Sequence, residues 1–452
     1  MKIIIVGCGR VGYSLAGKLN ADGNDVTVVD LSAEKIADVT SQFDVMGAVG
    51  NGATLSVLKE AGIADADLLI AVTNSDELNL LCCMIAKKEG DCETIARIKD
   101  PDYSKETEYL KKQLGLAMVI NPEYEAAKEI ARVLRFPTAM RIEPFGKGRV
   151  ELISFRLTAD NMLVGQSVRE VMGKLRANVQ FATVERGDDT YIVNGDTIFA
   201  EKDVLTLVST PKDASEFFEK IHLKGFFVKD AMVVGGGIIT HYLCEILDRS
   251  GIALKIIDKR YETCEELASA WTKATVINAN PSDHTLLKEQ GIERTDAFVA
   301  LCGLDEENIL LSLFAKEWGV KKLVTKINRI DYDGVIAKLD LDTVICPKNL
   351  TSDIILRYVR SAKSAKNSNM ENLYNIVPDD KVEAVEFIVK EGSKIIGKPL
   401  SQLQFKKDIL VASIVRDGTV ILPRGNDMIM AGDSVVLVTK DVALSEITDV
   451  LE

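Results

Sequence analysis

The sequence predicts an α/β protein of two tandem units, each a doubly wound parallel-sheet Rossmann domain followed by a small α+β domain. Three observations support this prediction. The two halves of the chain, residues 1–225 and 228–452, repeat one another. Short apolar segments alternate with amphipathic helical patterns in each unit, as βα steps do. A glycine-rich turn follows the first apolar segment and precedes the first helical pattern.

The repeat extends through both parts of each unit. VGCGRVGYSL, which begins at Val6, aligns with VGGGIITHYL, which begins at Val234. NPEYEAAKEIARVLR, from Asn121, aligns with CPKNLTSDIILRYVR, from Cys346. Near the end of each unit, AEKDVLTLVST aligns with AGDSVVLVTK. Chance does not produce so many matches in order, so the chain is a duplication, with domains predicted at residues 1–136, 140–225, 228–362 and 370–452.

Six short apolar segments predict the strands of the first Rossmann domain. Their near-continuous apolar character, without alternation, is typical of strands buried on both faces of a parallel sheet. Six βα steps within about 125 residues describe a doubly wound sheet. The predicted strands are Ile3–Val6, Val26–Val29, Val45–Val49, Leu68–Val72, Thr94–Ile98 and Met118–Ile120.

The second part of each unit has a different pattern. Val150–Leu157 and Val382–Lys390 alternate between apolar and polar residues, which predicts half-exposed strands. FATVERGDDTYIV and VASIVRDGTVIL each predict a hairpin, with Gly187 and Asp417-Gly418 in the turns.

Each small domain is predicted to end in an amphipathic helix, at Ala214–Ile221 and at Val442–Leu451. The polar composition of Arg135–Glu143 and Ser361–Asn369 predicts the linkers between the Rossmann and small domains.

The glycine-rich turn, residues 7–12, has the GxGxxG pattern in the correct context. It follows a predicted strand and precedes a predicted helix, and Asp30 ends the next strand. Gly7 permits the tight turn, Gly9 lets backbone reach a diphosphate, and Gly12 lets the helix approach the strand. Asp30 can accept both ribose hydroxyls, and its charge disfavours a 2′-phosphate, so NADP is a poor candidate.

Arg10 and Val11 lie inside this turn. A guanidinium beside the turn can contact a terminal phosphate. ATP offers such a phosphate and NAD does not. The sequence therefore leaves open whether the ligand is NAD(H) or ATP/ADP.

Polar residues follow the later strands of the same domain. The loop that starts at Asn51 can hold an adenine, and Thr73 and Asn74 lie beyond the fourth strand, where open α/β sheets bind ligands. Asn74 or Ser75 can equally be the N-cap of a helix over Asp76–Lys87. Arg97 ends the fifth strand and can face a phosphate, a carboxylate or solvent.

The second Rossmann domain carries an altered turn. Gly235 and Gly237 keep the first two glycines of the pattern, and Asp258 keeps the acidic position. Thr240 replaces the last glycine, and Ile238 stands where the first copy has Arg10. We therefore expect a weaker nucleotide site in the second copy, with its occupancy open.

Composition excludes several other functions. The net charge of −13 repels nucleic acid and anionic lipid. No apolar run approaches the roughly 18 residues of a membrane span, and the opening KIIIVG predicts no signal peptide. The eight cysteines form no CxxC pair and only three histidines are present, so we predict buried thiols in a reducing cytosol and no metal site.

An NAD-dependent dehydrogenase is the main alternative. Such an enzyme needs a residue that transfers a proton near the nicotinamide. The strands and hairpins of the small domains lack histidine, and His222 has no counterpart in the second copy. We therefore predict no catalytic residues and no enzymatic activity.

The chain resembles the TrkA family of peripheral regulatory subunits of Trk potassium uptake systems. GCGRVG, VVD at Asp30, NGAT from Asn51 and TNSDELN from Thr73 carry the resemblance. Each unit resembles a KTN domain, also called RCK, followed by a TrkA C-terminal domain. Asn51 stands where family members commonly have Asp.

The resemblance implies a cytoplasmic protein that is held at the inner face of the cell membrane by a Trk-type channel subunit. It implies homo-oligomers, either dimers or tetramers that form rings, whose shape responds to nucleotide. It further implies a second effector on the small domains, such as a cyclic dinucleotide or an ion. A different transporter remains an alternative partner. The implied nucleotide contacts are Gly7, Gly9, Arg10, Val11, Gly12, Asp30, Asn51, Thr73, Asn74, Arg97 and Glu123.

Overall fold

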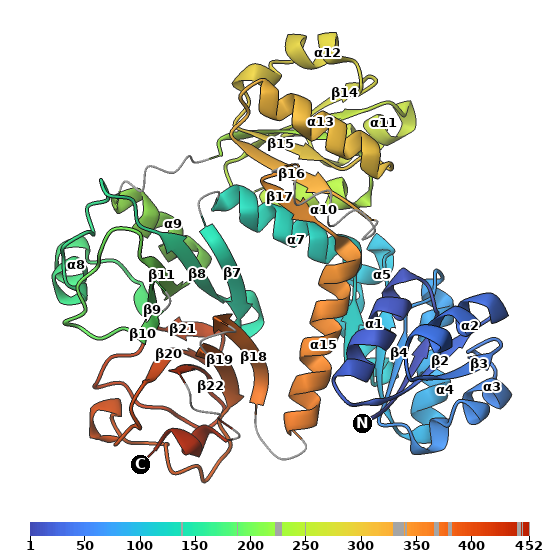
Figure 1. Ribbon diagram of the computed structural model, residues 1–452, viewed down its shortest axis with the longest axis horizontal. Helices are drawn as coiled ribbons and strands as arrows, with labels where there is room; N and C mark the ends of the chain where they lie inside the picture. Colours follow the sequence, from blue (N-terminus) through green and yellow to red (C-terminus); the bar gives the residue numbers. More distant parts are fainter. Residues whose placement is uncertain are drawn as a thin grey trace. The chain divides into compact units, whose positions relative to one another are not determined.

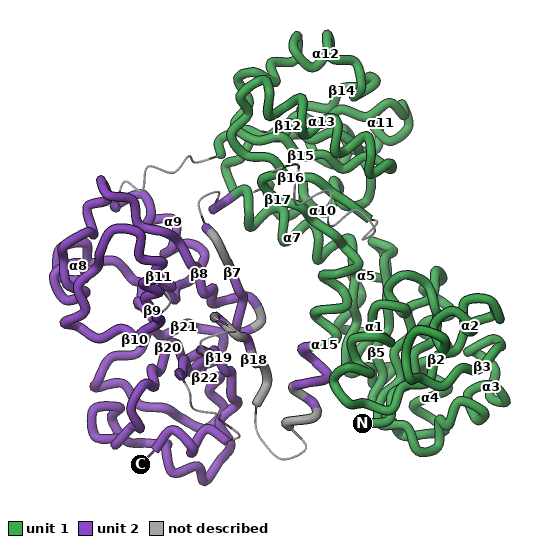
Figure 2. The backbone as a smooth tube through the Cα atoms, viewed as in Figure 1, with its two compact units in different colours: residues 1–134, 228–356 green, residues 135–227, 357–452 purple. Residues whose placement is uncertain are grey.

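The computed structural model describes residues 1–136, 139–187, 189–221, 228–248, 250–328, 339, 341–365, 370–377, 382–440, 444 and 446–451. The chain folds into two compact structural units, which are not the two repeats of the sequence (Figure 2). Unit 1 comprises Met1–Leu134 and Val228–Leu356, and unit 2 comprises Arg135–Phe227 and Arg357–Glu452. Each unit therefore combines equivalent parts of the two repeats: both Rossmann sheets lie in unit 1 and both small-domain sheets lie in unit 2.

The first Rossmann sheet is parallel, with the strand order β3-β2-β1-β4-β5-β6. Figure 1 labels β2, β3 and β4 of this sheet. The strand order reverses beside β1, and sheets of this kind bind ligands beyond the carboxyl ends of the strands at that point. The strands are β1 (Lys2–Val6), β2 (Asp25–Asp30), β3 (Met46–Val49), β4 (Leu68–Ala71), β5 (Glu93–Arg97) and β6 (Met118–Ile120). The helices are α1 (Arg10–Ala21), α2 (Ala33–Gln42), α3 (Leu55–Glu60), α4 (Asp76–Gly90), α5 (Pro101–Lys105), α6 (Thr107–Leu114) and α7 (Pro122–Arg135).

The predicted strands of this sheet are confirmed to within one residue at each end. Every residue of β4 is buried, which explains why its sequence is apolar without alternation. The predicted helix after β4 is confirmed as α4.

The second Rossmann sheet repeats this topology in the order β14-β13-β12-β15-β16-β17. Its strands are β12 (Asp230–Val234), β13 (Ala253–Asp258), β14 (Thr275–Asn278), β15 (Ala297–Ala300), β16 (Lys322–Lys326) and β17 (Thr343–Ile345). Its helices are α10 (Ile238–Leu247), α11 (Tyr261–Ala270), α12 (His284–Glu289), α13 (Asp305–Glu317) and α15 (Pro347–Ala365).

Unit 2 contains two antiparallel five-stranded sheets of identical topology, β10-β9-β11-β8-β7 and β21-β20-β22-β19-β18. The first has β7 (Ala139–Phe145), β8 (Val150–Arg156), β9 (Gln180–Arg186), β10 (Asp189–Ile192) and β11 (Val204–Ser209), with α8 (Val168–Leu175) and α9 (Pro211–Lys220). The second has β18 (Met370–Val377), β19 (Val382–Ile388), β20 (Ile409–Arg416), β21 (Thr419–Ile421) and β22 (Ser434–Lys440).

Both predicted hairpins are confirmed as β9–β10 and β20–β21. Gly187 has a φ of 64°, and Asp417 and Gly418 have φ values of 48° and 81°. Positive φ at both central residues is the requirement of a type I′ turn, which explains the Asp-Gly pair.

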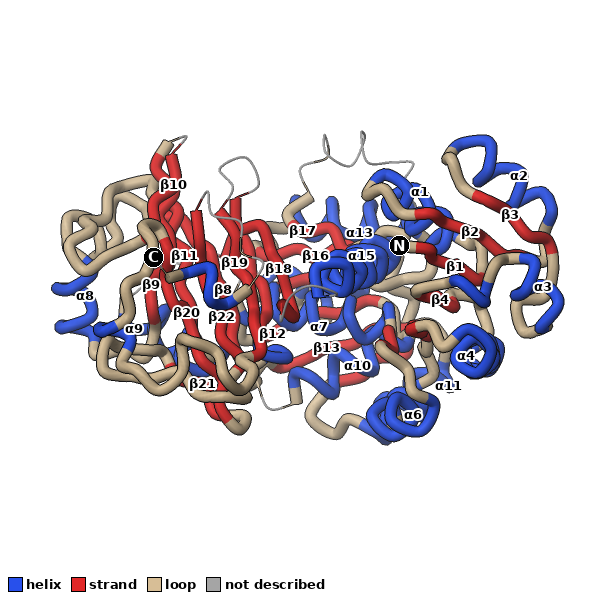
Figure 3. Tube along the Cα trace, turned by 90° about the horizontal axis from the view of Figure 1, so that it is seen from below, coloured by secondary structure: helices blue, strands red, loops and turns tan. Residues whose placement is uncertain are grey.

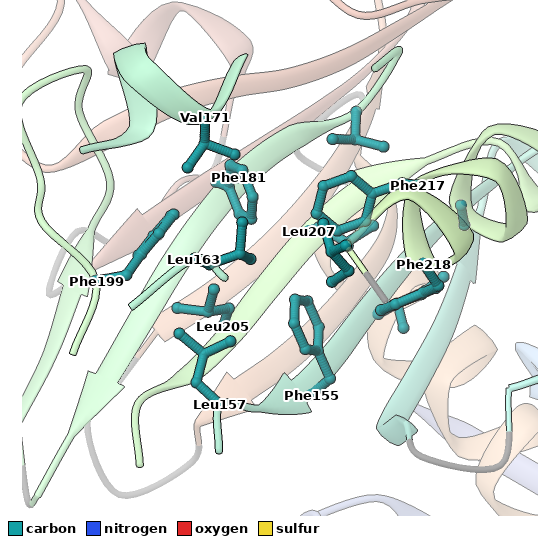
Figure 4. Close-up of a cluster of buried hydrophobic side chains, with 14 of the residues drawn as sticks. Phe155, Leu157, Leu163, Val171, Phe181, Phe199, Leu205, Leu207, Phe217 and Phe218 are labelled. Atoms are coloured by element: carbon teal, nitrogen blue, oxygen red, sulfur yellow. The ribbon is translucent and has the colours of Figure 1, made fainter. Parts of the chain in front are cut away.

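One aromatic cluster forms the core of the first small domain (Figure 4). Phe155 of β8 packs edge-on against Phe217 and Phe218 of α9, with ring centroids 6.4 and 5.1 Å apart. Phe181 of β9 and Leu205 of β11 complete the contact between sheet and helix. The predicted helix at Ala214–Ile221 is therefore confirmed, starting three residues earlier.

The prediction of half-exposed strands in the small domains is wrong for β8 and β19. β8 is buried at all positions except its last, and β19 is buried or half-buried throughout. The two sheets, whose strands are red in Figure 3, form a second core together. In this core Val150 and Leu152 share a cluster with Ala384 and Val436. The face of β8 that carries Val150 and Leu152 is thus covered by the neighbouring sheet rather than solvated.

The linker predictions need correction as well. β7 begins at Ala139, inside the predicted linker Arg135–Glu143, and α15 extends to Ala365, inside the predicted linker Ser361–Asn369. The predicted helix at Val442–Leu451 is a single short 3₁₀ turn at Ile447–Val450 among the described residues. His222 and residues 366–369 lie outside the described residues.

Seven of the eight cysteines are buried and Cys346 is half-buried, all as free thiols. Burial raises the pKa of Cys82 to about 12, which makes its thiol unreactive at neutral pH. In the part of the chain that the structure describes, no helix is long and apolar enough to cross a membrane.

Candidate functional site

The turn between β1 and α1 has a backbone that only glycine fits at two positions. Gly7 has a φ of +102°, and a Cβ there would lie 2.9 Å from the Thr73 backbone nitrogen. A Cβ on Gly12 would lie 1.9 Å from the Gly7 carbonyl oxygen. Both glycines therefore shape the turn, as the sequence predicts.

Gly9 is different, because its conformation suits any residue. Its φ and ψ are −73° and −172°, and a Cβ there would have no atom within 4 Å. Gly9 is the N-cap of α1, and no side chain caps the helix. The free N–H groups of the first turn of α1 therefore face open space, which is the arrangement that binds phosphate.

Asp30 lies at the carboxyl end of β2 and braces the turn. Its Oδ2 accepts from the Cys8 N–H at 2.7 Å, and its Oδ1 accepts from the Ser32 N–H at 2.9 Å. Each carboxylate oxygen keeps acceptor capacity beyond these bonds, and the Asp30 side chain is 13% exposed. This geometry fits the predicted role of accepting ribose hydroxyls.

A cavity of about 490 Å³ opens in front of the turn, inside unit 1. It lies between the two Rossmann domains and is lined by residues of both glycine-rich turns, at the starts of α1 and α10. Six predicted residues of the first domain and one of the second line it: Gly9, Arg10, Val11, Asn74, Arg97, Glu123 and Gly237.

The other predicted residues do not line the cavity: Gly7, Gly12, Asp30, Asn51, Thr73, Gly235 and Asp258. The Asn51 Oδ1 accepts from the Ala53 N–H at 3.0 Å, inside its own loop. The Thr73 hydroxyl donates to Asn79 Oδ1 at 2.7 Å. The capping question is also resolved: the Ser75 hydroxyl oxygen accepts from the Leu78 N–H and caps α4, which leaves Asn74 at the cavity.

Most of the charged side chains among the described residues of the cavity wall are cations. Arg10 and Arg97 come from the first domain, Lys326 and Lys348 come from the second, and Glu123 is the one carboxylate among them. Arg97 Nη2 lies 3.9 Å from Glu123 Oε1, and Arg97 Nη1 donates to the Thr73 carbonyl at 3.1 Å. Four positive charges against one negative charge favour a polyanionic ligand.

The electrostatics of the two lysines support the same conclusion. Burial lowers the pKa of Lys326. Burial, followed by repulsion from Arg10 and Arg97, lowers the pKa of Lys348. An anion in the cavity would offset that repulsion. Arg97 Nε and Glu123 Oε2 are also buried without a hydrogen-bond partner in the structure, so the wall retains unused polar groups.

The second Rossmann domain has the same turn with different contacts at its acid. Gly235 has a φ of +99°, and Gly237 again has open space at its Cβ position. Asp258 Oδ2 accepts from the Gly236 N–H at 2.7 Å, as Asp30 does from Cys8. The Arg260 guanidinium also binds this carboxylate, with Nε 3.2 Å from Oδ1.

Thr240, which replaces the last glycine, is fully buried, and its hydroxyl donates to the Gly235 carbonyl. The pKa of Asp258 reflects these surroundings. Burial acts to raise it, but the hydrogen bonds from Arg260 and from the Gly236 N–H outweigh burial and lower it.

The sequence prediction missed Lys326, Lys348 and Arg260. The repeat itself carries the signal for two of them, because Arg97 aligns with Lys326 and Glu123 aligns with Lys348. Both pairs line one cavity. Among the described residues, no group of acidic, histidine and cysteine side chains is arranged to hold a metal ion.

Two sequence families match the chain, each of them twice. The TrkA-N domain matches residues 3–122 and 231–347, and the TrkA-C domain matches residues 152–222 and 384–452.

Curated relatives match over the full length. The Trk system potassium uptake protein TrkA homolog 1 of Methanosarcina mazei is 32% identical over 99% of both chains. The Trk system potassium uptake protein TrkA of Halomonas elongata is 29% identical over 98% of this chain and 96% of its own.

Solved structures share the fold at low identity. The GsuK channel bound to NAD matches with a TM-score of 0.64 and 16% identity, over 97% of this chain and 77% of the channel chain. GsuK bound to ADP matches with a TM-score of 0.51 and 14% identity, over 79% and 69%.

Proposed function

Because this chain belongs to the TrkA family, with both family domains present twice, we propose that it is a nucleotide-responsive regulatory subunit of a Trk-type potassium uptake channel. The observation that best supports a response to nucleotide is the cationic cavity at the glycine-rich turn before α1. The proposed role is regulatory and not enzymatic, so NADH added with a panel of carbonyl substrates should stay unoxidised.

The ligand in this proposal is a nucleotide whose ribose binds Asp30 and whose phosphates lie at the N-terminus of α1. NAD(H) and ATP or ADP both meet this requirement, and GsuK has been solved with NAD and with ADP. The cations around the cavity favour ATP or ADP, because only these ligands end in phosphates that can reach them.

Regulation follows from the position of the cavity between two domains. A ligand that contacts both domains binds one of their arrangements better than another, and it shifts their equilibrium by that difference in affinity. The proposed partner is a membrane-embedded channel subunit, which would hold the chain as a peripheral protein at the cytoplasmic face. Co-purification of the chain with a Trk channel subunit tests the partner.

The site itself is tested by Gly9→Ala. The new methyl group meets no protein atom and suits the backbone, so we expect unchanged thermal stability. It occupies the space where phosphate would approach, so calorimetric titration should show at least tenfold weaker binding of both ATP and NADH.

Gly173→Ala is the matched control, since a Cβ at Gly173 in α8 also has no atom within 4 Å. Its nucleotide affinity should equal that of the unmodified chain. Equal affinity in Gly9→Ala as well would refute the placement of the nucleotide at this turn.

A further inference from the structure

The two Rossmann domains share one topology but differ in the groups that surround their ligand positions. In the first domain, the residue two positions after the strand-ending acid is Ser32, which contacts Asp30 through its backbone N–H. In the second domain, the same position holds Arg260. Its backbone N–H donates to Asp258 Oδ1 at 2.8 Å, and its Nε donates to the same oxygen at 3.2 Å.

Arg260 therefore makes the hydrogen bonds that a ribose would need from Asp258. Its Nη2 lies 3.4 Å from Oδ2, so both carboxylate oxygens face the guanidinium. The Asp258 side chain is 8% exposed. A ribose would have to displace the Arg260 guanidinium, whose side chain is 57% exposed, before it could bind this acid. At Asp30 the paired cation, Lys35 Nζ, lies farther away, at 3.9 Å.

The phosphate end of the second domain has changed as well. Ile238 stands at the first residue of α10, where α1 has Arg10. Two cations of the second domain, Lys326 and Lys348, line the cavity shared with the first domain's turn.

Two contacts place Lys348 beside the first domain's phosphate-binding groups. The Lys348 Nζ donates to the Asn328 carbonyl at 3.0 Å, and Arg10 Nη1 donates to the same carbonyl at 3.3 Å. One carbonyl thus holds a cation from each domain.

We infer that the second Rossmann domain holds no nucleotide of its own and instead supplies Lys326 and Lys348 to the terminal phosphates of the nucleotide held by the first. The chain then binds one nucleotide. This inference rests on the proposed function, because it requires a nucleotide on the turn of the first domain.

Calorimetric titration of the full chain with ATP and with AMP tests both parts. We expect one ATP per chain. Lys348→Gln should lower the affinity for ATP about tenfold and leave the affinity for AMP unchanged, because AMP lacks the phosphates that reach the second domain. Lys321→Gln is the control, because it removes the same charge from a residue that precedes β16 and does not line the cavity. It should bind both nucleotides as the unmodified chain does.

A stoichiometry of two ATP per chain would overturn the inference. An equal loss of ATP and AMP affinity in Lys348→Gln would also overturn it. That result would mean that the lysine maintains the structure of the cavity and does not contact the terminal phosphates. An unaltered ATP affinity in Lys348→Gln would overturn it too.

Paired variants at the two acids separate this inference from the proposed function. Asp30→Asn should lower the affinity of the chain for ATP. Asp258→Asn should leave both the affinity for ATP and the number of ATP molecules bound per chain unchanged. Circular dichroism checks that both variants fold. Loss of a binding event in Asp258→Asn sinks the inference alone. Normal binding in Asp30→Asn together with normal binding in Gly9→Ala sinks the proposed function instead.

Discussion

Arg10 and Ile238 begin equivalent helices and line the same cavity. The arginine can donate two parallel hydrogen bonds to a phosphate, and the isoleucine can donate none. Under the proposed function, we expect the residues at the helix starts to contribute to the preference for one nucleotide over another, while Gly7 and Gly12 shape the turn.

Arg10→Ala should weaken ATP more than NADH. ATP ends in a phosphate that the guanidinium can reach, whereas the dinucleotide diphosphate is already held by the N–H groups of α1. We expect a loss of about fivefold to fiftyfold for ATP and less than threefold for NADH in competitive titrations. Lys59→Ala, an exposed lysine of the same domain, is the control. Equal losses for the two ligands would show that Arg10 serves the shared diphosphate.

The sequence was sufficient for the shape of the turn, because a strand–turn–helix of this kind requires Gly7 and Gly12 at fixed spacing. The roles of Gly9 and Asp30 toward a ligand stay predictions.

The sequence was not sufficient for Lys348, whose neighbour Arg10 is more than 300 positions away along the chain. Nor did it show that Arg260 would turn back onto Asp258, because an arginine two residues beyond a strand can equally point to solvent. The role of each of these side chains depends on tertiary contacts.

The long loops of both small domains are held by the same ion pair. Arg186 binds Asp203 through Nε and Nη2, each at 2.8 Å, and Arg416 binds Asp433 through the same atoms at 2.9 and 2.8 Å. Each arginine also donates to a loop carbonyl, of Ile198 or Met428. In each small domain, this ion pair thus connects the first strand of the hairpin to the loop that precedes the last strand.

Asp433→Ala should destabilise unit 2 by about 3 kcal/mol, because Asp433 is 1% exposed. Its removal leaves the Met430 N–H without its acceptor and leaves Arg416 only the Met428 carbonyl. Urea unfolding followed by circular dichroism measures the change. Glu391→Ala, at an exposed position, should stay within about 0.5 kcal/mol of the unmodified chain. A loss below 1 kcal/mol for Asp433→Ala would mean that the loop is held by other contacts.

Strands and hairpins were predictable because their patterns are local: an Asp-Gly pair between two apolar runs specifies its turn. The burial of the second face of β8 was not predictable from the sequence, because it depends on a sheet from the other half of the chain. Leu152 points into that shared core and Phe155 into the domain's own core, and the sequence alone does not distinguish the two environments.

At the scale of the whole molecule, equivalent domains pack together: the Rossmann domains form unit 1 and the small domains form unit 2. Surfaces that associate within one chain are present in every copy, and repeated association of like surfaces leads to closed symmetric assemblies. We propose that this arrangement supports assembly of several chains into a ring.

We expect the full chain to be a dimer or a tetramer in solution, with a shape that changes on addition of ATP or NADH. Multi-angle light scattering gives the mass, and small-angle scattering with and without each nucleotide gives the shape. The Gly9→Ala variant should keep the mass and lose the change in shape. A monomer with superimposable profiles under all conditions would remove the basis for gating through ring shape.

Unit 1 pairs two copies of one domain, and their covalent connection has an evolutionary consequence. In a pair of identical chains related by a twofold axis, every substitution appears on both sides of the interface at once. Glu123 and Lys348 hold equivalent positions and line one cavity; identical chains would place two glutamates or two lysines there. Fusion of the copies lets each side mutate separately, so the symmetry can break while the interface persists. Selection could then divide one task between two unequal halves.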